Sequence, residues 1–129
     1  MEYLTGSTTV ATLAPEAYRR RAGVCQDFAH VLLGILRAAG IPARYASGYL
    51  HPGSDAPIGM AVTGQSHAWV EAWVGQWVPI DPTNQVPVGE CHVLVATGRD
   101  YADVTPLKGI YNGGPAESLG VKVELTRVR

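Results

Sequence analysis

The feature that most constrains this chain is an amphipathic helical pattern that starts at a cysteine and ends at a glycine. Gly23 allows a tight entry, Cys25 lies in the first turn, and Asp27 can accept hydrogen bonds from the unpaired amides there. Gly40 ends the pattern, and Pro42 prevents the helix from resuming. Apolar residues recur at helical spacing along one stripe, at Phe28, Leu32, Leu33, Leu36 and Ala39. The pattern therefore predicts one long helix over residues 25–39, packed along this stripe.

Cys25 can be interpreted in two ways from this stretch alone. A thiol at a helix N-terminus faces unpaired N–H groups and the positive end of the helix dipole, and both favour the thiolate. A lone cysteine is also commonly a small buried hydrophobic residue. Both interpretations of Cys25 stay open until the other polar residues are considered.

The rest of the chain predicts an α+β fold with an antiparallel sheet. A short helix is expected over residues 15–21, and strands over residues 43–50, 66–74, 77–81, 91–97 and 121–128. The dipeptide Gly75-Gln76 is typical of a two-residue hairpin connection. Residues 51–65 and 98–114 are rich in glycine, proline and aspartate, which predicts loops. A helix followed by hairpin-linked strands is typical of an α+β domain.

Length and composition limit the kind of protein that this can be. With 129 residues, 47% of them hydrophobic, the chain is expected to form one compact domain over residues 1–129. A net charge of −1 gives no electrostatic reason to expect nucleic acid or an anionic membrane as a partner. No apolar run reaches membrane-spanning length, and the first residues lack the features of a signal peptide. Because two cysteines make no disulfide framework, we expect a reducing, cytoplasmic location.

Two further polar residues lie at the ends of the predicted hairpin. His67 begins its first strand and Asp81 ends its second, so antiparallel pairing brings both to one end of the sheet. Counting outward from the turn places Asp81 opposite Val70, about three residues short of His67, a gap that twist or a bulge has to close. Taken separately, His67 could be a structural histidine and Asp81 an Asx-turn residue. Beside Cys25 these separate interpretations become weaker, because a thiolate nucleophile needs a base and the base needs an orienting partner.

Four segments carry a family resemblance. They are GVCQDFAHVLLGILRAAGIPARYASGYL from Gly23, SHAWVEAWV from Ser66, WVPIDPTN from Trp77 and HVLVATGRDYADVTPLKGIYNGG from His92. In these segments the chain resembles the transglutaminase-like superfamily of papain-type thiol enzymes, in particular its bacterial members regarded as candidate cysteine proteases. The resemblance covers most of residues 23–114, and its most specific part is the order of a Cys at a helix start, His-Ala-Trp-Val-Glu and Asp-Pro-Thr-Asn.

The resemblance implies a papain-like core in which an N-terminal catalytic helix packs on an antiparallel sheet. It also implies a Cys25–His67–Asp81 triad that cleaves or transfers an acyl group at an amide through an acyl-thioester, in a peptide or a small amide substrate. The acidic clusters with which animal transglutaminases bind calcium are absent from the sequence, so neither a cofactor nor a metal is expected. Bacterial relatives usually carry a β-domain before this core, so the chain is either a minimal enzyme or part of a longer protein.

Other interpretations remain beside this one. A transglutaminase-like domain can be a catalytically inert binding domain. Cys25, His30, Cys91 and His92 could form a zinc site, although their spacing does not match the usual ligand pairs. His30 lies five positions after Cys25 and is expected to pack away from it. The tryptophans of the hairpin either line an acyl cleft or belong to the core.

Overall fold

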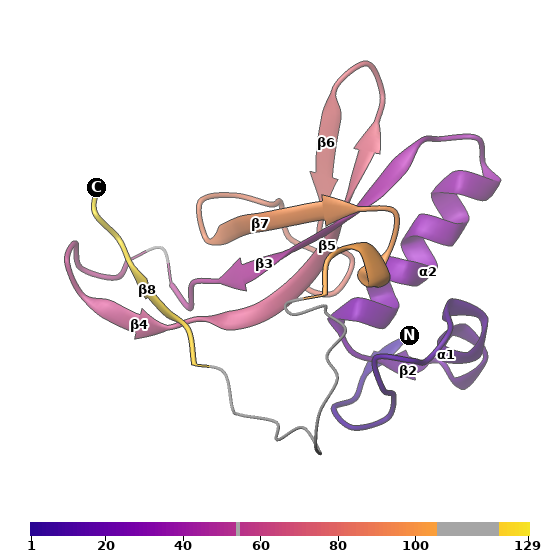
Figure 1. The fold of residues 1–129 in the computed structure, drawn as a ribbon, viewed down its shortest axis with the longest axis horizontal. Helices are drawn as coiled ribbons and strands as arrows, with labels where there is room; N and C mark the ends of the chain where they lie inside the picture. The colour runs from indigo at the N-terminus through magenta and orange to yellow at the C-terminus, as the bar shows by residue number, and fades with distance from the viewer. Residues whose placement is uncertain (54, 106–121) are drawn as a thin grey trace, which may run out of the picture.

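A computed structural model describes residues 1–53, 55–105 and 122–129 of the chain and shows a mixed α/β architecture around one antiparallel sheet (Figure 1). The four strands of this sheet lie in the order β6-β5-β3-β7, and each neighbouring pair is antiparallel. Two small two-stranded sheets, β1 with β2 and β4 with β8, lie outside it. The elements are β1 (Glu2–Tyr3), α1 (Ala14–Arg20), β2 (Ala22–Gly23), α2 (Cys25–Ala38), β3 (Ala43–Leu50), β4 (Ala61–Thr63), β5 (Gln65–Trp73), β6 (Trp77–Ile80), β7 (His92–Gly98), the 3-10 turn η1 (Tyr101–Asp103) and β8 (Glu124–Thr126).

Helix α2 starts at Cys25, as the sequence predicts, and the start is fixed by Asp27. The Asp27 carboxylate accepts hydrogen bonds from the Val24 amide at 2.8 Å and from the Thr8 hydroxyl. A Cβ on Gly23 would lie 2.6 Å from the Cβ of Asp27, so only glycine fits at this entry. Because Asp27 is almost completely buried, this arrangement places the first turn of α2 firmly against the rest of the domain.

The core lies between α2 and one face of the sheet. Leu33 and Ala29 of the helix pack against Tyr45 of β3 and against Ala68 and Val70 of β5. Since side chains alternate along a strand, the residues between these, such as His67 and Trp69, point to the opposite face. The helix and the predicted catalytic histidine therefore approach strand β5 from different sides.

Most of the predicted elements are present with small shifts at their ends. The long helix and the strand over residues 43–50 match closely, and the other three predicted strands of the main sheet differ by one residue at one or both ends. The loop predicted over residues 51–65 is wrong in part, because residues 61–63 form β4 and pair with β8. Only residues 124–126 of the predicted strand 121–128 are β-structure, and residues 106–114 of the predicted irregular segment lie outside the described residues.

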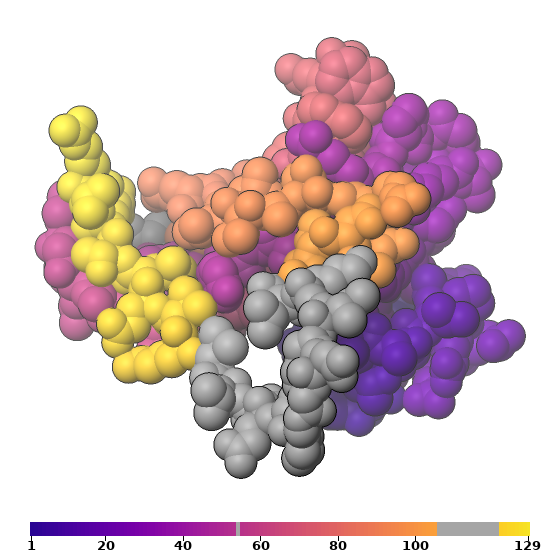
Figure 2. All heavy atoms as spheres, viewed as in Figure 1, coloured from indigo at the N-terminus to yellow at the C-terminus, as the bar shows by residue number. Residues whose placement is uncertain are grey.

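The hairpin between β5 and β6 corrects the predicted register. Trp73 pairs with Trp77, so the connection has three residues, 74–76, with a left-handed glycine at Gly75 (φ 92°). The expected two-residue turn paired Val74 instead, which displaced the register by one position. The observed pairing of Val70 with Ile80 moves Asp81 one residue closer to His67 than the sequence count placed it. The hairpin tip projects beyond the sheet, while β7 crosses the middle of the face shown in Figure 2.

Among the described residues, no helix has the length and apolarity that a membrane crossing requires.

Candidate active site

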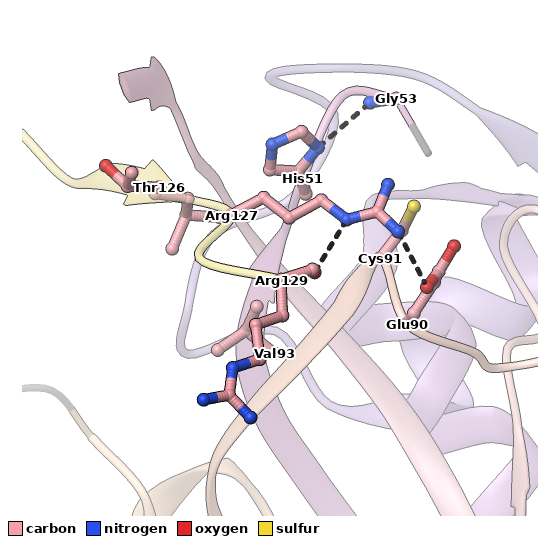
Figure 3. Close-up of a pocket in the computed structure, with 9 residues that line it drawn as sticks. His51, Gly53, Glu90, Cys91, Val93, Thr126, Arg127 and Arg129 are labelled. Carbon is pink, nitrogen blue, oxygen red and sulfur yellow. Dashed lines mark hydrogen bonds and ion pairs between the residues drawn. The ribbon is translucent and has the colours of Figure 1, made fainter. Parts of the chain in front are cut away.

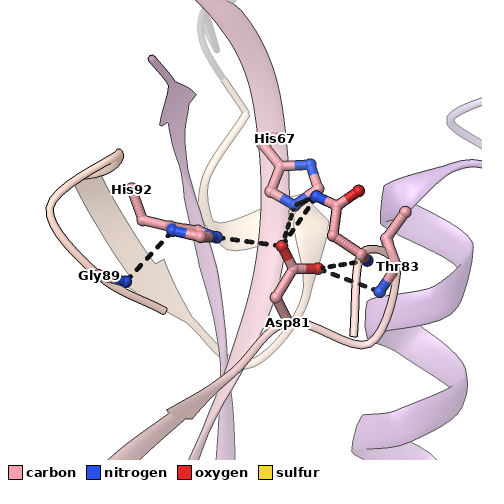
Figure 4. Close-up of polar contacts among 6 residues, drawn as sticks. His67, Asp81, Thr83, Gly89 and His92 are labelled. Carbon is pink, nitrogen blue, oxygen red and sulfur yellow. Dashed lines mark hydrogen bonds and ion pairs between the residues drawn. The ribbon is translucent and has the colours of Figure 1, made fainter. Parts of the chain in front are cut away.

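The centre of the candidate site is a hydrogen bond between His67 and Asp81 (Figure 4). Nε2 of His67 lies 2.8 Å from Oδ2 of Asp81, and both side chains are buried. The register of the hairpin explains this contact. Asp81 directly follows β6 at the level of Trp69, and His67 lies two residues further along β5 on the same face. The observed register reduces the offset from three residues to two, and the Asp81 and His67 side chains span the rest diagonally on the same face.

Asp81 accepts hydrogen bonds at both carboxylate oxygens. Oδ1 accepts from the backbone amides of Thr83 at 3.0 Å and Asn84 at 3.2 Å, which is an Asx turn. Oδ2 accepts from His67, from the Asn84 side chain at 3.0 Å and from Nε2 of His92 at 3.0 Å. Asp81 thus forms an Asx turn through Oδ1 and the contact with His67 through Oδ2, and its role in orienting His67 stays a prediction.

These hydrogen bonds determine the charge of Asp81. Burial by itself raises the pKa of the carboxyl, but the hydrogen bonds from His92 and His67 and from the Asn84 amide outweigh it and hold the pKa at about 2. An ionised carboxylate has only acceptors, so Nε2 of His67 carries the proton of that bond. None of the described residues hydrogen-bonds to the other ring nitrogen, Nδ1, which is left as a proton acceptor.

Cys25 is the first residue of α2 and packs against the core beside β5. The backbone N–H groups of Ala68, Gln26 and Cys25 itself face the thiol, and each lowers its pKa. Burial has the larger effect, however, and together with the negative charge of Asp81 it leaves the pKa of the thiol raised. The amides at the helix N-terminus therefore favour the thiolate, as the sequence predicts, but burial outweighs them. A thiolate at neutral pH requires a base that takes the proton.

Sequence reasoning missed His92 as a site residue. Its side chain is only 5% exposed and meets Asp81 from β7, a strand that is adjacent to neither β5 nor β6. The sequence does show a histidine at the start of a predicted strand, in the segment HVLVATG, which is where a site residue can lie. Without the pairing of β7 with β3, however, nothing in the sequence brings that histidine to Asp81.

Comparison with known proteins identifies the family. The model of the transglutaminase-like superfamily matches residues 1–82, a range that includes Cys25, His67 and Asp81. The chain belongs to the transglutaminase-like superfamily. A crystal structure from Cytophaga hutchinsonii, described as a putative cysteine protease, superposes with a TM-score of 0.69 at 40% identity and covers 81% of this chain and 34% of that one. The predicted α+β, papain-like fold class is thereby confirmed.

Sequence relatives of this transglutaminase-like chain come from several bacteria. An uncharacterised protein of Mycobacterium leprae is 52% identical over 99% of this chain and 46% of its own length. One of Mycobacterium tuberculosis is 42% identical over 95% of this chain and 42% of its own length. The chain thus spans less than half the length of these relatives. The protein-glutamine gamma-glutamyltransferase of Pseudomonas aeruginosa is 42% identical over 71 residues, which cover 51% of this chain and 10% of that protein.

The four residues considered for a zinc site do not gather in this transglutaminase-like fold. Cys91 lines a separate pocket of about 270 Å³ beside His51 and Arg127 (Figure 3). Nε2 of His30 accepts a hydrogen bond from the Tyr101 amide at 3.1 Å, so His30 packs as expected. The group in the described ranges with metal-type ligand atoms is instead His67, Asp81 and His92, with these atoms within 4.8 Å of one another. Hydrogen bonds already join these three side chains, and the absence of a metal stays a prediction.

Of the three hairpin tryptophans, Trp69 is buried as a core residue, whereas Trp73 and Trp77 fit neither expected role. Trp69 is buried, with its ring stacked at 6.2 Å from that of His67 and edge-on at 5.3 Å from that of His92. Trp73 and Trp77 are 44% and 39% exposed and contact each other near the hairpin tip. The guanidinium of Arg44 lies 4.0 Å above the Trp77 ring. Trp69 therefore supports the site from the sheet, whereas the other two lie away from it.

Proposed function

We propose that this domain catalyses thiol-dependent acyl transfer or hydrolysis at an amide bond, with Cys25 as nucleophile, His67 as general base and acid, and Asp81 as the residue that orients His67. The observation that carries the proposal is the buried hydrogen bond between Asp81 and Nε2 of His67. It fixes the imidazole in the tautomer whose Nδ1 accepts a proton. Cys25 lies at the edge of the same strand, where the Ala68 amide faces its thiol.

The proposed first half-reaction proceeds in two steps. Nδ1 of His67 takes the proton of the Cys25 thiol, and the sulfur attacks the carbonyl carbon of the substrate, so that a C–S bond forms and the oxygen becomes an oxyanion. Backbone amides of the first turn of α2, which already face the thiol, are the natural donors to that oxyanion. The oxyanion then collapses, the C–N bond breaks, and the leaving amine takes the proton from His67. An acyl-thioester on Cys25 remains.

The second half-reaction decides between hydrolysis and transfer. His67 removes a proton from either water or an amine, and the acceptor displaces Cys25, which regains its proton. Water gives a carboxylic acid and an amine gives a new amide. The names of the relatives point to both outcomes, since one is described as a protease and another as a gamma-glutamyltransferase. The chemistry up to the thioester is the same for both, and the substrate is a peptide or a small amide.

The test is a screen of amide and thioester acyl donors, each assayed in water alone and with hydroxylamine as the amine acceptor. We expect release of the leaving group, and an increase in the intact mass of the protein by one acyl group when turnover is quenched early. Cys25→Ala should abolish both signals, whereas the matched variant Cys91→Ala should retain them because Cys91 lines a different pocket. Turnover that persists in Cys25→Ala would exclude the proposed mechanism. A folded wild type that binds donors without turnover would favour the inert binding domain.

A further inference from the structure

His92 is held on both sides of its ring. Its Nε2 lies 3.0 Å from Oδ2 of Asp81, and its Nδ1 accepts a hydrogen bond from the Gly89 amide at 3.3 Å (Figure 4). Since Nδ1 is an acceptor in that bond, the proton of the neutral ring is on Nε2 and is donated to Asp81. The edge-on contact with Trp69 fixes the plane of the ring. His92 is therefore oriented as a single-tautomer donor toward the carboxylate.

Three strands contribute to this arrangement. Asp81 follows β6, His67 lies on β5, and His92 begins β7, with β3 between the last two strands. At the crossing point β3 has Gly48, which pairs with His67, and a Cβ at that position would lie 2.0 Å from the Val93 carbonyl oxygen and 2.9 Å from the Trp69 ring. Because Gly48 has no side chain, β7 and the Trp69 ring can pack closely against β3 at this position. Both histidines can then donate to the same oxygen of Asp81.

The same three side chains could also be considered as metal ligands, but their hydrogen bonds favour donation. A histidine that binds a metal through Nε2 usually donates its Nδ1–H to a neighbouring acceptor. In His92, Nδ1 accepts a hydrogen bond from the Gly89 amide, so the single proton of the neutral ring is on Nε2. Nε2 could bind a metal only if the ring lost that proton and became an imidazolate. Donation to Asp81 needs no such change.

From this geometry we propose that His92 is a positioning residue, which holds the Asp81 carboxylate in the orientation that accepts the Nε2 proton of His67. The Asx turn fixes the Oδ1 side of the carboxylate. On the Oδ2 side, Asn84 also donates a hydrogen bond, but Asn84 is exposed. His92 is the buried donor that completes this side. The kinetic consequence rests on the proposed acyl-transfer function, whereas the effect on the His67 ring does not.

Two variants separate hydrogen bonding from packing. His92→Gln keeps an N–H donor at a similar reach but loses the ring, whereas His92→Phe keeps the ring against Trp69 but loses the donor. If His92 acts through its hydrogen bond, the Phe variant should lose roughly 10- to 100-fold in kcat with little change in KM, and the Gln variant should recover most of that loss. His51→Gln, at the residue that follows β3 and outside the network, is the matched control and should behave as wild type. The opposite ranking, with Phe active and Gln impaired, would reduce His92 to a packing residue.

A measurement without substrate separates this inference from the proposed function. NMR of protein labelled with 15N-histidine reports which ring nitrogen of His67 carries the proton. We expect the Nε2–H tautomer in the wild type, in His51→Gln and in His92→Gln, and a mixture of tautomers in His92→Phe, with circular dichroism to confirm that each variant is folded. An unchanged His67 signal in folded His92→Phe would overturn the positioning role even if the wild type is active. A changed signal in a protein without activity would instead leave the positioning role and refute only the acyl-transfer proposal. Stoichiometric zinc that binds the wild type but not His92→Gln would assign His92 as a metal ligand and likewise overturn the inference.

Discussion

Replacement of Asp81 by asparagine perturbs the site most selectively, because it removes the charge and keeps the size of the side chain. The carboxylate accepts two backbone amides at one oxygen and three side-chain donors at the other. An asparagine has one acceptor oxygen, so in either orientation its NH₂ group faces donors that lose their acceptor. The shift of the Asp81 pKa from 3.8 to about 2 is equivalent to about 2 kcal/mol of stabilisation of the ionised form. With the unpaired donors added, Asp81→Asn should lower the free energy of unfolding at pH 7 by about 2 to 4 kcal/mol.

The pH dependence of this loss identifies its cause. Because the pKa of Asp81 is depressed in the folded state, its contribution to stability is complete above the ordinary value of 3.8 and is lost as the pH falls to about 2. Urea unfolding should therefore show a large difference between wild type and Asp81→Asn at pH 7 that shrinks between pH 4 and pH 2. On an active acyl donor, kcat/KM should fall roughly 10- to 1000-fold, less than in a serine triad, because a thiol–imidazole pair depends less on its third member. A folded Asp81→Asn protein with wild-type stability and kinetics would refute this reasoning and leave Asp81 as a turn residue.

Two further predictions concern the scaffold. Gly48→Ala should destabilise the fold by about 1 to 3 kcal/mol, because the new methyl group meets the Val93 carbonyl oxygen. Gly34→Ala lies in the middle of α2 on its exposed side with open space around it, and it should stabilise the fold by about 0.5 to 1 kcal/mol. Urea unfolding compares the two variants, and equal effects would contradict the close approach of β3 and β7. Burial lowers the pKa of His30, so the stability that its neutral form supports is present above its ordinary value of 6.5 and is lost as the pH falls below it. His30→Gln should therefore lose less stability than wild type between pH 7.5 and pH 5, and identical losses would show that His30 does not titrate with unfolding.

Periodicity and turn residues predict most of the fold. The long helix is correct because Gly23, Asp27 and Gly40 are local signals at its ends, and the strand at residues 43–50 is bounded equally clearly. Strand β4 was missed because it has only three residues and pairs with β8, more than sixty positions away in the chain. Local sequence does not encode such a pairing.

The candidate site was predictable in three of its members but not in its fourth or in its energetics. Cys25, His67 and Asp81 could be proposed from their motifs, although a one-residue error in the hairpin turn left the last two too far apart. His92 could not, because its contact with Asp81 depends on the sheet order β5-β3-β7. The pKa of Cys25 was expected to be depressed by the helix N-terminus. Burial against the core, which only the tertiary structure shows, reverses that direction.

The most direct test of the account is the rate at which iodoacetamide alkylates Cys25 as a function of pH, measured by mass spectrometry with Cys91 as internal reference. Since burial raises the pKa of the Cys25 thiol, a reactive thiolate near neutral pH has to come from proton transfer to His67. We predict that in the wild type Cys25 is alkylated faster than Cys91 at neutral and mildly acidic pH. In folded His67→Ala, Cys25 should become the slower of the two and react appreciably only at alkaline pH. The same pH profile for Cys25 in both proteins would contradict the claim that Cys25 and His67 act as a pair.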